Sequence, residues 1–587
     1  MAEDNKNKGM RKGLTSYGDA DFSLFLRKAF IKAMGYSDDA LNRPIIGVAN
    51  TFSGYNACHR NAPELVEAIK RGVMLAGGLP VEFPTISIHE SFAYPTSMFT
   101  RNLMSMDTEE MVKGQPMDAV VLIGGCDKTV PAQLMAAASA NVPAVQVVTG
   151  PMMTGSHRGE RLGACTDCRR YWARFRAGEI DEAETEEVSG KLAPTAGTCM
   201  VMGTASTMAC MTEALGMMLP GGAAIPAVAS DRLRHAEAAG TRAVAMAAEG
   251  LTPDKILTPE AFSNAFRILL AIGGSTNGLV HMTAVAGRCG IKVDMEALDR
   301  MGQETPVLVD LKPSGQHYME DLEKAGGLTT VMRELRSLLN LDCLTITGRT
   351  LGENLDAAPA PWAQDVVKTM NDPIFPAGGI AVLRGNLAPG GAIIKQSAAS
   401  EELMSHTGRA VVFESLEDLA NRIDDPDLDV AAGDVLVLQN SGPKGAPGMP
   451  ESGYIPIPRK LAEQGVKDML RMSDARMSGT AFGAIVLHIT PESADGGPLG
   501  LVQTGDRITL DVPGRRLELL VDEDEMARRR ANWTPPPAHD GAERGYLKLY
   551  LDTVNQADEG VDFDFLAKEP DGRMTPWPAV VEYCDSD

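Results

Sequence analysis

The N-terminal part of the chain alternates between short apolar runs and longer segments with helical character. Residues 119–123 are apolar throughout and rich in β-branched side chains, which is typical of a strand buried on both faces of a parallel sheet. Good helix formers occupy residues 131–138, and a second apolar run follows at residues 144–148. This order predicts a βαβ unit with a strand-to-helix turn at residues 124–129.

Similar units are predicted on both sides of this one. Strands are expected at residues 44–49 and 83–88, and Leu65, Ile69 and Val73 recur every four residues in a helix that begins near residue 62. A polar, charged segment at residues 156–190 indicates a helical insertion on the surface. Further helices are predicted at residues 21–34, 208–218, 231–249, 259–271 and 328–339.

The pattern changes after residues 354–376, a stretch that contains Pro, Ala and Asp. Short β-rich runs, mostly separated by Gly or Pro, then dominate, and a helix is expected from Ser415 because Asp418 completes a capping-box-like pattern. We therefore predict an α/β protein with a parallel-sheet domain over residues 1–375 and a smaller, β-barrel-like domain over residues 376–587. Its strands are expected at residues 379–384, 392–395, 410–413, 435–439, 484–489, 507–512 and 516–521.

Charge and composition narrow the class of protein. Among 587 residues, 55 Lys and Arg face 78 Asp and Glu, and the formal net charge of −23 argues against nucleic acid or an anionic membrane as a partner. No apolar run approaches the roughly 20 residues that span a bilayer, and the polar start lacks a signal-peptide pattern. We expect a cytoplasmic enzyme of small metabolites, whose nine cysteines stay reduced.

Three cysteines lie in small-residue loops at the start of predicted helices. Cys58, Cys126 and Cys199 are far apart in sequence, but parallel sheets gather such loops along one edge. The positions leave two alternatives open: buried reduced thiols without a role, or three thiolates that hold an iron-sulfur cluster with one iron site free. The close pair Cys165 and Cys168 lies in the charged insertion and lacks a second pair at zinc-finger spacing, which argues against a metal or redox site there.

Carboxylates at loop positions are candidate ligands for a hard cation such as Mg²⁺. Glu90 follows a predicted strand, Asp127 adjoins Cys126, and Glu451 ends a rigid Gly- and Pro-rich loop. Each is equally compatible with a solvated surface position. Lys128 cannot bind a cation as an ammonium, so it is either carbamylated or a clamp for phosphate or carboxylate.

Residues 473–480 form a last dense polar stretch, which as a turn or helix end needs no function. Neither a Gly-x-Ser-x-Gly elbow nor a phosphate-binding P-loop sequence occurs, which argues against serine hydrolases and P-loop enzymes. Several motifs together nevertheless resemble the dihydroxyacid and sugar-acid dehydratase family, in the right order and over nearly the whole chain. They are residues 125–128, 197–199, 273–277, 384–389, Gly442-Pro443 with Gly448 and Glu451, and residues 473–479.

Within that family, the sequence Arg-Gly-Glu-Arg at 158–161 and the overall length look more like the pentonate and other aldonate dehydratases. The resemblance implies a homodimer or homotetramer with its active site between the domains. It implies that Cys58, Cys126 and Cys199 bind a [2Fe-2S] cluster, and that Ser478 is the base, with Thr480 as a positioning contact. It also implies that Mg²⁺ is held by Glu90, Asp127, carbamylated Lys128 and Glu451.

These parts suit the dehydration of a sugar acid to a 2-keto-3-deoxy acid. Mg²⁺ would hold the carboxylate and the C2 oxygen, a Ser478 alkoxide would take the C2 proton, and the open iron would accept the C3 hydroxyl. A 2,3-dihydroxyacid dehydratase of branched-chain amino-acid synthesis is the alternative with the same chemistry. An iron-sulfur redox protein, or a metal-free binding protein, is the alternative from another class.

Overall fold

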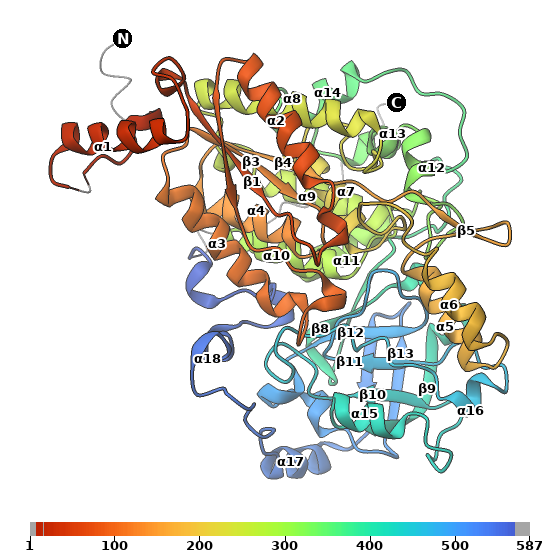
Figure 1. Ribbon diagram of the computed structural model, residues 1–587. Coiled ribbons are helices and arrows are strands. Elements are labelled where there is room, and N and C mark those ends of the chain that lie inside the picture. The colour runs from red at the N-terminus through yellow and green to blue at the C-terminus, as the bar shows by residue number, and fades with distance from the viewer. Residues whose placement is uncertain (1–7, 16, 570–587) are drawn as a thin grey trace, which may run out of the picture.

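The computed structural model describes residues 8–15 and 17–569, so residues 1–7 of the polar start lie outside the described part of the chain. An N-terminal α/β region and a C-terminal barrel region pack against each other (Figure 1). The predicted parallel sheet is confirmed, with four strands in the order β2-β1-β3-β4. They are β1 (Ile45–Asn50), β2 (Leu79–Pro84), β3 (Ala119–Gly124) and β4 (Ala144–Val148), and every neighbouring pair is parallel.

Helices cover the sheet as its apolar strands require, because β3 and β4 are buried along their whole length. α2 (Ala62–Leu75) packs on α8 (Ser230–Glu249), and α3 (Arg101–Gly114) packs on α4 (Thr129–Ala140), with the two pairs above and below the sheet in Figure 1. The first pair approaches closely at Gly72, where an added Cβ would lie 1.9 Å from the Glu237 carbonyl oxygen.

The rest of the N-terminal region is mainly helical. α9 (Pro259–Ala271) is apolar and almost wholly buried, which explains why it lies at the centre of the core rather than on the surface. The other helices include α1 (Ala20–Ala33), α7 (Thr204–Ala214), α10 (Asn277–Arg288), α11 (Met295–Glu304), α12 (Met319–Lys324), α13 (Gly327–Glu334) and α14 (Leu351–Ala357).

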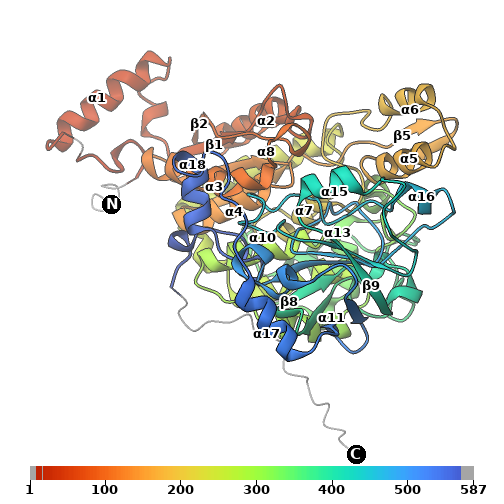
Figure 2. The same ribbon diagram turned by 90° about the horizontal axis from the view of Figure 1, so that it is seen from below.

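The insertion at residues 156–190 is only partly helical. It begins with an antiparallel hairpin of β5 (Gly155–His157) and β6 (Glu160–Leu162), and then forms α5 (Thr166–Arg176) and α6 (Glu182–Ser189). In Figure 2 this insertion lies at the end of the molecule opposite α1, beside the barrel.

The C-terminal region contains a closed barrel in the strand order β10-β11-β12-β8-β7-β14-β13-β9, which confirms the barrel-like core. Apolar side chains from alternate positions fill its interior. Seven of its strands fall at predicted places, whereas β11 was not predicted. The strands are β7 (Ala381–Gly385), β8 (Ala388–Ile394), β9 (Ser405–Phe413), β10 (Val435–Leu438), β11 (Arg471–Ser473), β12 (Ile485–Thr490), β13 (Arg507–Asp511) and β14 (Arg516–Leu519).

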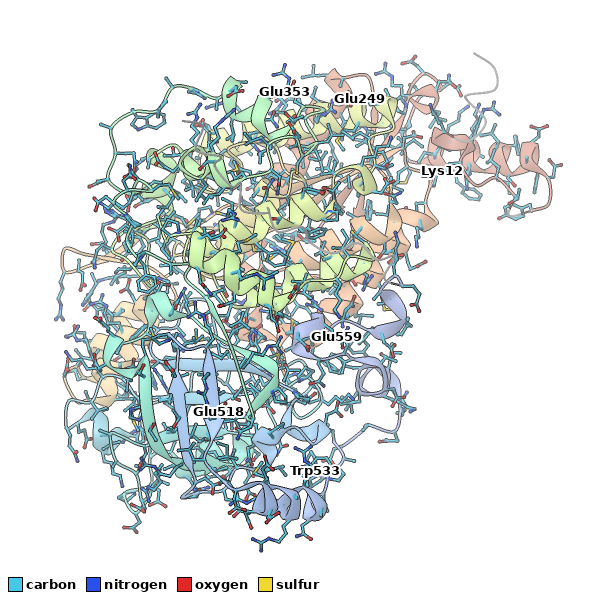
Figure 3. All side chains as sticks on the ribbon, turned by 180° about the vertical axis from the view of Figure 1, so that it is seen from behind. Lys12, Glu249, Glu353, Glu518, Trp533 and Glu559 are labelled. Carbon is cyan, nitrogen blue, oxygen red and sulfur yellow. The ribbon has the colours of Figure 1, made fainter. Side chains whose placement is uncertain are left out.

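After the barrel the chain returns to the N-terminal region. This last part contains α17 (Glu523–Asn532) and α18 (Gly545–Thr553), whereas α15 (Leu416–Arg422) and the short α16 (Arg459–Ala462) lie between barrel strands. Figure 3 shows Trp533 below the barrel, just after α17, and Glu559 beside the N-terminal helices. There the Arg101 guanidinium donates to the Gly560 and Val561 carbonyls, and Arg288 pairs with Asp562 at 2.5 Å.

The strand expected at residues 83–88 is wrong in its bounds, because β2 ends at Pro84, the partner of the last residue of β1, and residues 85–88 are a loop. Within the described ranges, no helix is both long enough and apolar enough to cross a membrane.

Candidate active site

Two neighbouring strands, β1 and β3, send their connections to opposite edges of the sheet. β1 leads to β2 on one side, and β3 leads to β4 on the other. In an open parallel sheet, the crevice beyond the strand ends at such a reversal is where ligands bind. Cys58 lies in the loop after β1, and Cys126 lies in the turn after β3. The topology therefore brings these two thiols together at the ligand-binding edge.

The buried imidazole of His59 joins the two loops. Its Nε2 accepts the backbone N–H groups of Gly125 and Cys126, each at 2.9 Å, and its Nδ1 lies 2.9 Å from the Thr51 carbonyl oxygen. Burial lowers the pKa of His59 to about 4, so the ring is neutral and donates from Nδ1. Gly125 is required here because a Cβ would lie 1.8 Å from the Thr149 hydroxyl oxygen.

The thiols at this edge influence one another. The neighbouring Cys126 thiol lowers the pKa of Cys58 to about 6, and the Cys58 thiol raises the pKa of Cys126. Cys199 lies in the loop before α7, which is held because Thr198 donates to the Gly150 carbonyl at 2.9 Å. The Sγ atom of Cys199 is 3.6 Å from that of Cys165.

The thiols of Cys58 and Cys199 are also within electrostatic reach of each other. The hydrogen bond with Cys165 and burial raise the pKa of Cys199, and the nearby charge of Cys58 adds to this. The hydrogen bonds with Cys168 and Cys199 lower the pKa of Cys165. The edge of the sheet therefore gathers the three predicted cysteines, together with Cys165 from the insertion.

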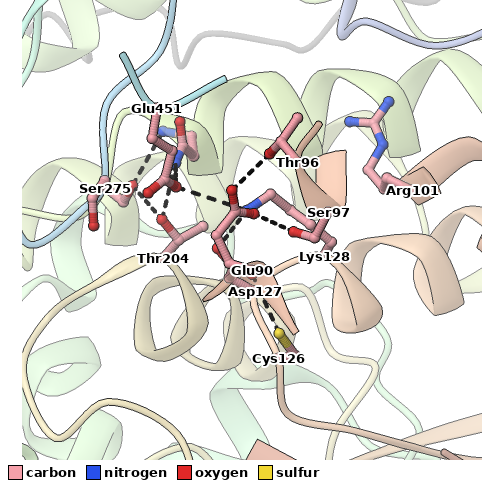
Figure 4. Close-up of polar contacts among 12 residues, drawn as sticks. Glu90, Thr96, Ser97, Arg101, Cys126, Asp127, Lys128, Thr204, Ser275 and Glu451 are labelled. Atoms are coloured by element: carbon pink, nitrogen blue, oxygen red, sulfur yellow. Dashed lines mark hydrogen bonds and ion pairs between the residues drawn. The ribbon is translucent and has the colours of Figure 1, made fainter. Parts of the chain in front are cut away.

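Three carboxylates form a compact group next to the thiols. Oxygen atoms of Glu90, Asp127 and Glu451 lie within 4.8 Å of one another, an arrangement that can hold a metal ion. Glu90 lies beyond the loop that follows β2 and Asp127 lies in the turn after β3, whereas Glu451 comes from the barrel region. Figure 4 shows the three side chains converging on Lys128.

The ammonium of Lys128 lies among these oxygens, at the first turn of α4. Its Nζ contacts Asp127 and lies 3.3 Å from Glu90 and 3.8 Å from Glu451. Burial and Arg476 act to lower the pKa of Lys128, but the three carboxylates outweigh both and raise it. The three carboxylates therefore favour a positively charged group between them.

A second buried cation, Arg476, connects the carboxylates from the barrel side. It donates to Glu451 at 2.6 Å and to the Thr96 hydroxyl at 2.8 Å, and it lies 3.7 Å from Glu90. Burial acts to raise the pKa of Glu90, but Lys128 and Arg476 lower it by more. For Glu451, burial is the larger effect and raises the pKa.

The predicted base lies on the loop after Arg476. An isolated antiparallel bridge pairs Ser452 with Met477, so Glu451 and Ser478 each lie one residue from the bridged pair. The hydroxyl groups of Ser478 and Thr480 are 2.9 Å apart. This loop therefore adjoins the carboxylate group.

The N-terminal region holds this loop from the other side. The Asn277 amide donates to the Met477 carbonyl at 3.0 Å and approaches Glu451 at 3.5 Å. Gly479 is needed because a Cβ would lie 2.6 Å from Ser275 Cβ and 2.7 Å from the Thr204 backbone nitrogen. The loop is thus fixed between the two regions of the molecule.

Comparison with known proteins identifies the family. Residues 43–354 match the N-terminal part of the dihydroxy-acid/6-phosphogluconate dehydratase family, and residues 365–561 match its C-terminal part. The chain belongs to this dehydratase family. The resemblance seen in the motifs is thereby confirmed.

Among its curated relatives are enzymes named for sugar acids. The chain is 49% identical to an L-arabonate dehydratase of Azospirillum brasilense over 94% of this chain and 96% of the relative. It is 46% identical to an L-arabinonate dehydratase of Rhizobium leguminosarum bv. trifolii, over 94% and 95% of the two chains. A putative dehydratase of Rhizobium meliloti is 48% identical, over 94% and 96%.

The donor atoms fit the cofactors that the family resemblance implies. Cys58, Cys126 and Cys199 are soft thiol ligands gathered at one edge, and all three are free cysteines. The oxygens of Glu90, Asp127 and Glu451 are hard ligands suited to Mg²⁺. The dehydratase thus has one candidate ligand set of each kind.

Four residues of this candidate site were given no role in it from the sequence. His59 follows the predicted ligand Cys58, whereas Asn277 and Arg476 lie inside the recognised stretches of residues 273–277 and 473–480, and all three link distant segments. Their roles depend on contacts between distant segments, which no local pattern indicates. Cys165 was set aside although its Cys-x-x-Cys spacing was a signal, because its contact with Cys199 is visible only in the fold.

Proposed function

We propose that the protein dehydrates a sugar acid, an aldonate of the pentonate type, to the 2-keto-3-deoxy acid. The observation that carries this proposal is the meeting of thiols, carboxylates and the Ser478 loop at one place between the two regions. The names of the curated relatives support an aldonate as substrate. The family resemblance supports the reaction type.

In the proposed site, two sets of ligands would hold two different cofactors. Cys58, Cys126 and Cys199 would hold the [2Fe-2S] cluster, and Glu90, Asp127, carbamylated Lys128 and Glu451 would hold Mg²⁺. When bound, these groups supply Lewis acidity that stabilises negative charge on the acid and favours departure of the C3 hydroxyl. A carbamate on Lys128 would turn the central ammonium into a further oxygen ligand.

Ser478 is proposed to take the proton from C2 of the substrate at its Oγ atom. A serine hydroxyl is too weak a base at its ordinary pKa, so it would act as an alkoxide in a strongly positive environment. The neighbouring Thr480 hydroxyl, 2.9 Å away, would orient that oxygen. The C2 proton and the C3 hydroxyl leave together as water, and the enol that remains tautomerises to the 2-keto acid.

Arg476 is proposed to balance charge within the site. Its guanidinium donates to Glu451 at 2.6 Å and lies 3.7 Å from Glu90. It would therefore orient these side chains and favour their ionised forms. This is a positioning role, since Arg476 faces ligands rather than the reacting atoms.

An assay for 2-keto acid tests the proposal. Protein loaded anaerobically with iron, sulfide and Mg²⁺ would be incubated with a panel of pentonates, hexonates and branched 2,3-dihydroxy acids. We expect the pentonates to react fastest. Faster reaction of 2,3-dihydroxy-3-methylbutanoate would favour the branched-chain alternative, and no keto acid from any substrate would defeat the dehydratase proposal.

The same preparation distinguishes a dehydratase from the two alternatives that belong to other functional classes. A redox protein would carry iron but would be indifferent to replacement of Ser478, and a metal-free binding protein would be colourless after anaerobic purification. Since Cys165 contacts Cys199, loss of function on replacing Cys165 would not by itself favour the redox alternative. The Ser478 variant is therefore the discriminating one.

We further propose that the protein forms a homodimer or homotetramer. α1 projects from the body of the molecule (Figure 2), and the side chains of Phe25, Phe30 and of Met34 just after the helix are 66%, 73% and 74% exposed. Such a row of large apolar side chains is typical of a surface covered by a partner. Light scattering of the purified protein tests this, and a monomer at micromolar concentration would contradict it. A cytoplasmic location remains a prediction.

A further inference from the structure

The local fold holds Cys165 next to the cysteines gathered at the edge of the sheet. It precedes α5, and its Sγ lies 3.6 Å from that of Cys199. The turn that carries it is anchored by buried Asp167, which accepts the Gly163 N–H at 2.7 Å and the Tyr318 hydroxyl at 3.1 Å. The approach of the two sulfurs is therefore a property of the local fold.

The 3.6 Å separation of the Cys165 and Cys199 sulfur atoms is much longer than a disulfide bond of about 2.05 Å. It is close to the separation of about 3.8 Å expected for two thiolates that share one tetrahedral metal with bonds of about 2.3 Å. Cys58 and Cys126 lie at the same edge, on the two loops that His59 joins. Four thiols match the demand of a two-iron cluster, in which each iron takes two protein ligands.

The Cys165 turn also contacts the loop of the proposed base. The Thr166 hydroxyl donates to the Thr480 carbonyl oxygen at 3.3 Å, across the boundary between the insertion and the barrel region. Cys165 therefore lies beside Cys199 next to the loop that carries Ser478. A substrate that reaches both Ser478 and an open iron would approach from this side.

We propose that Cys165 is a fourth thiol ligand of the cluster site. Without substrate it binds beside Cys199, at the position that three thiolates leave open, and it withdraws when a substrate hydroxyl takes that position. The thiol proton passes to solvent as the iron–sulfur bond forms and is taken up again as that bond breaks, with no change in the oxidation state of iron. This inference rests on the proposed iron-sulfur dehydratase function.

Spectroscopy of cluster-loaded, full-length protein tests the proposal. Visible absorption and resonance Raman spectra would be compared for the wild type, Cys165→Ser and the control Cys343→Ser, with and without L-arabonate. We expect the wild type and Cys343→Ser to share a spectrum that L-arabonate shifts. Cys165→Ser should differ from both before L-arabonate is added. Identical spectra for all three proteins at equal iron content would overturn the proposal.

A second measurement uses the wild type alone and so does not depend on the folding of a variant. Alkylation of Cys165 by iodoacetamide would be followed by peptide mass spectrometry. We expect it to be about 10-fold slower in loaded protein than in cluster-free protein, and to recover when L-arabonate is added. Equal rates in all three states would overturn the proposal. Absence of iron or of keto acid in the wild type would instead count against the proposed function.

Discussion

The thiol group and the carboxylate group meet at Cys126 and Asp127, yet the chain builds them in different ways. All the thiols come from the N-terminal region, where β1 and β3 end and His59 joins the loops. The carboxylates need Glu451, which reaches them only because the barrel packs against that region. The first group depends on the edge of one sheet, and the second depends on the contact between two regions.

This difference predicts that substitutions in the thiol group and in the carboxylate group have distinguishable effects on iron content. A change at the sheet edge should remove iron, whereas a change on the barrel side should leave iron in place. Measuring iron content beside turnover therefore reports which half of the site was damaged.

The largest effect is expected from Cys126→Ser. Loss of a thiolate at the switch point should remove most iron and lower kcat/KM by more than about 100-fold, beyond the loss typical of an outer-shell partner. Iron analysis and the keto-acid assay measure both. Cys343→Ser, a half-buried cysteine beside Asn264, is the matched control and should keep both. Full iron in Cys126→Ser would remove this residue from the ligand set.

Ser478→Ala should keep its iron but lower kcat by roughly 100-fold to 10,000-fold, the usual contribution of a general base. Thr480→Ala removes only the neighbouring hydroxyl at 2.9 Å and should cost less. Turnover and visible spectra of both variants give the answer. An active Ser478→Ala enzyme would exclude Ser478 as the base.

Glu451→Gln tests the contact between the regions directly. The amide keeps the shape of the side chain but removes a charge that faces both Lys128 and Arg476. We expect normal iron content and a need for about 10-fold to 100-fold more Mg²⁺ at half-maximal activity. Unchanged Mg²⁺ dependence would show that the carboxylate group is not the magnesium site.

Gly479→Ala should have the smallest effect. Its methyl group would press on Ser275 Cβ and the Thr204 backbone, so the Ser478 loop must shift away from the N-terminal region. A displacement of this size is expected to lower kcat about 10-fold, with iron content unchanged. Gly433→Ala, where an added Cβ meets nothing within 4 Å, is the control. Loss of iron in Gly479→Ala would contradict the separation of the two halves.

Elements that are marked by their own local residue pattern were predicted best from the sequence. β1, β3 and β4 are apolar runs bounded by other residue types, and seven barrel strands are short β-rich runs mostly separated by Gly or Pro. β11 was not predicted because it has only three residues, two of them polar. α17 was not predicted because it is highly charged and buries no side chain. The bounds of β2 depend on where its partner β1 ends, which is not a property of its own residues.

The candidate site was predictable to the extent that its residues lie in loops at helix starts. What could not be predicted are the side chains that connect distant segments. Arg476 joins Thr96 to Glu451, and Asn277 joins α10 to the Met477 carbonyl. Such roles arise from packing of the barrel on the α/β region, so they become visible only in three dimensions.

The separation of the two groups along the chain also sets an order for biosynthesis. Cys58, Cys126, Cys165 and Cys199 are all made before translation of the barrel begins, whereas Glu451 and Ser478 are made later. Because domains generally fold in N-to-C order during synthesis, the sheet edge that gathers the thiols can form before the carboxylate group is complete. A nascent chain would therefore present these four thiols before it could turn over any substrate.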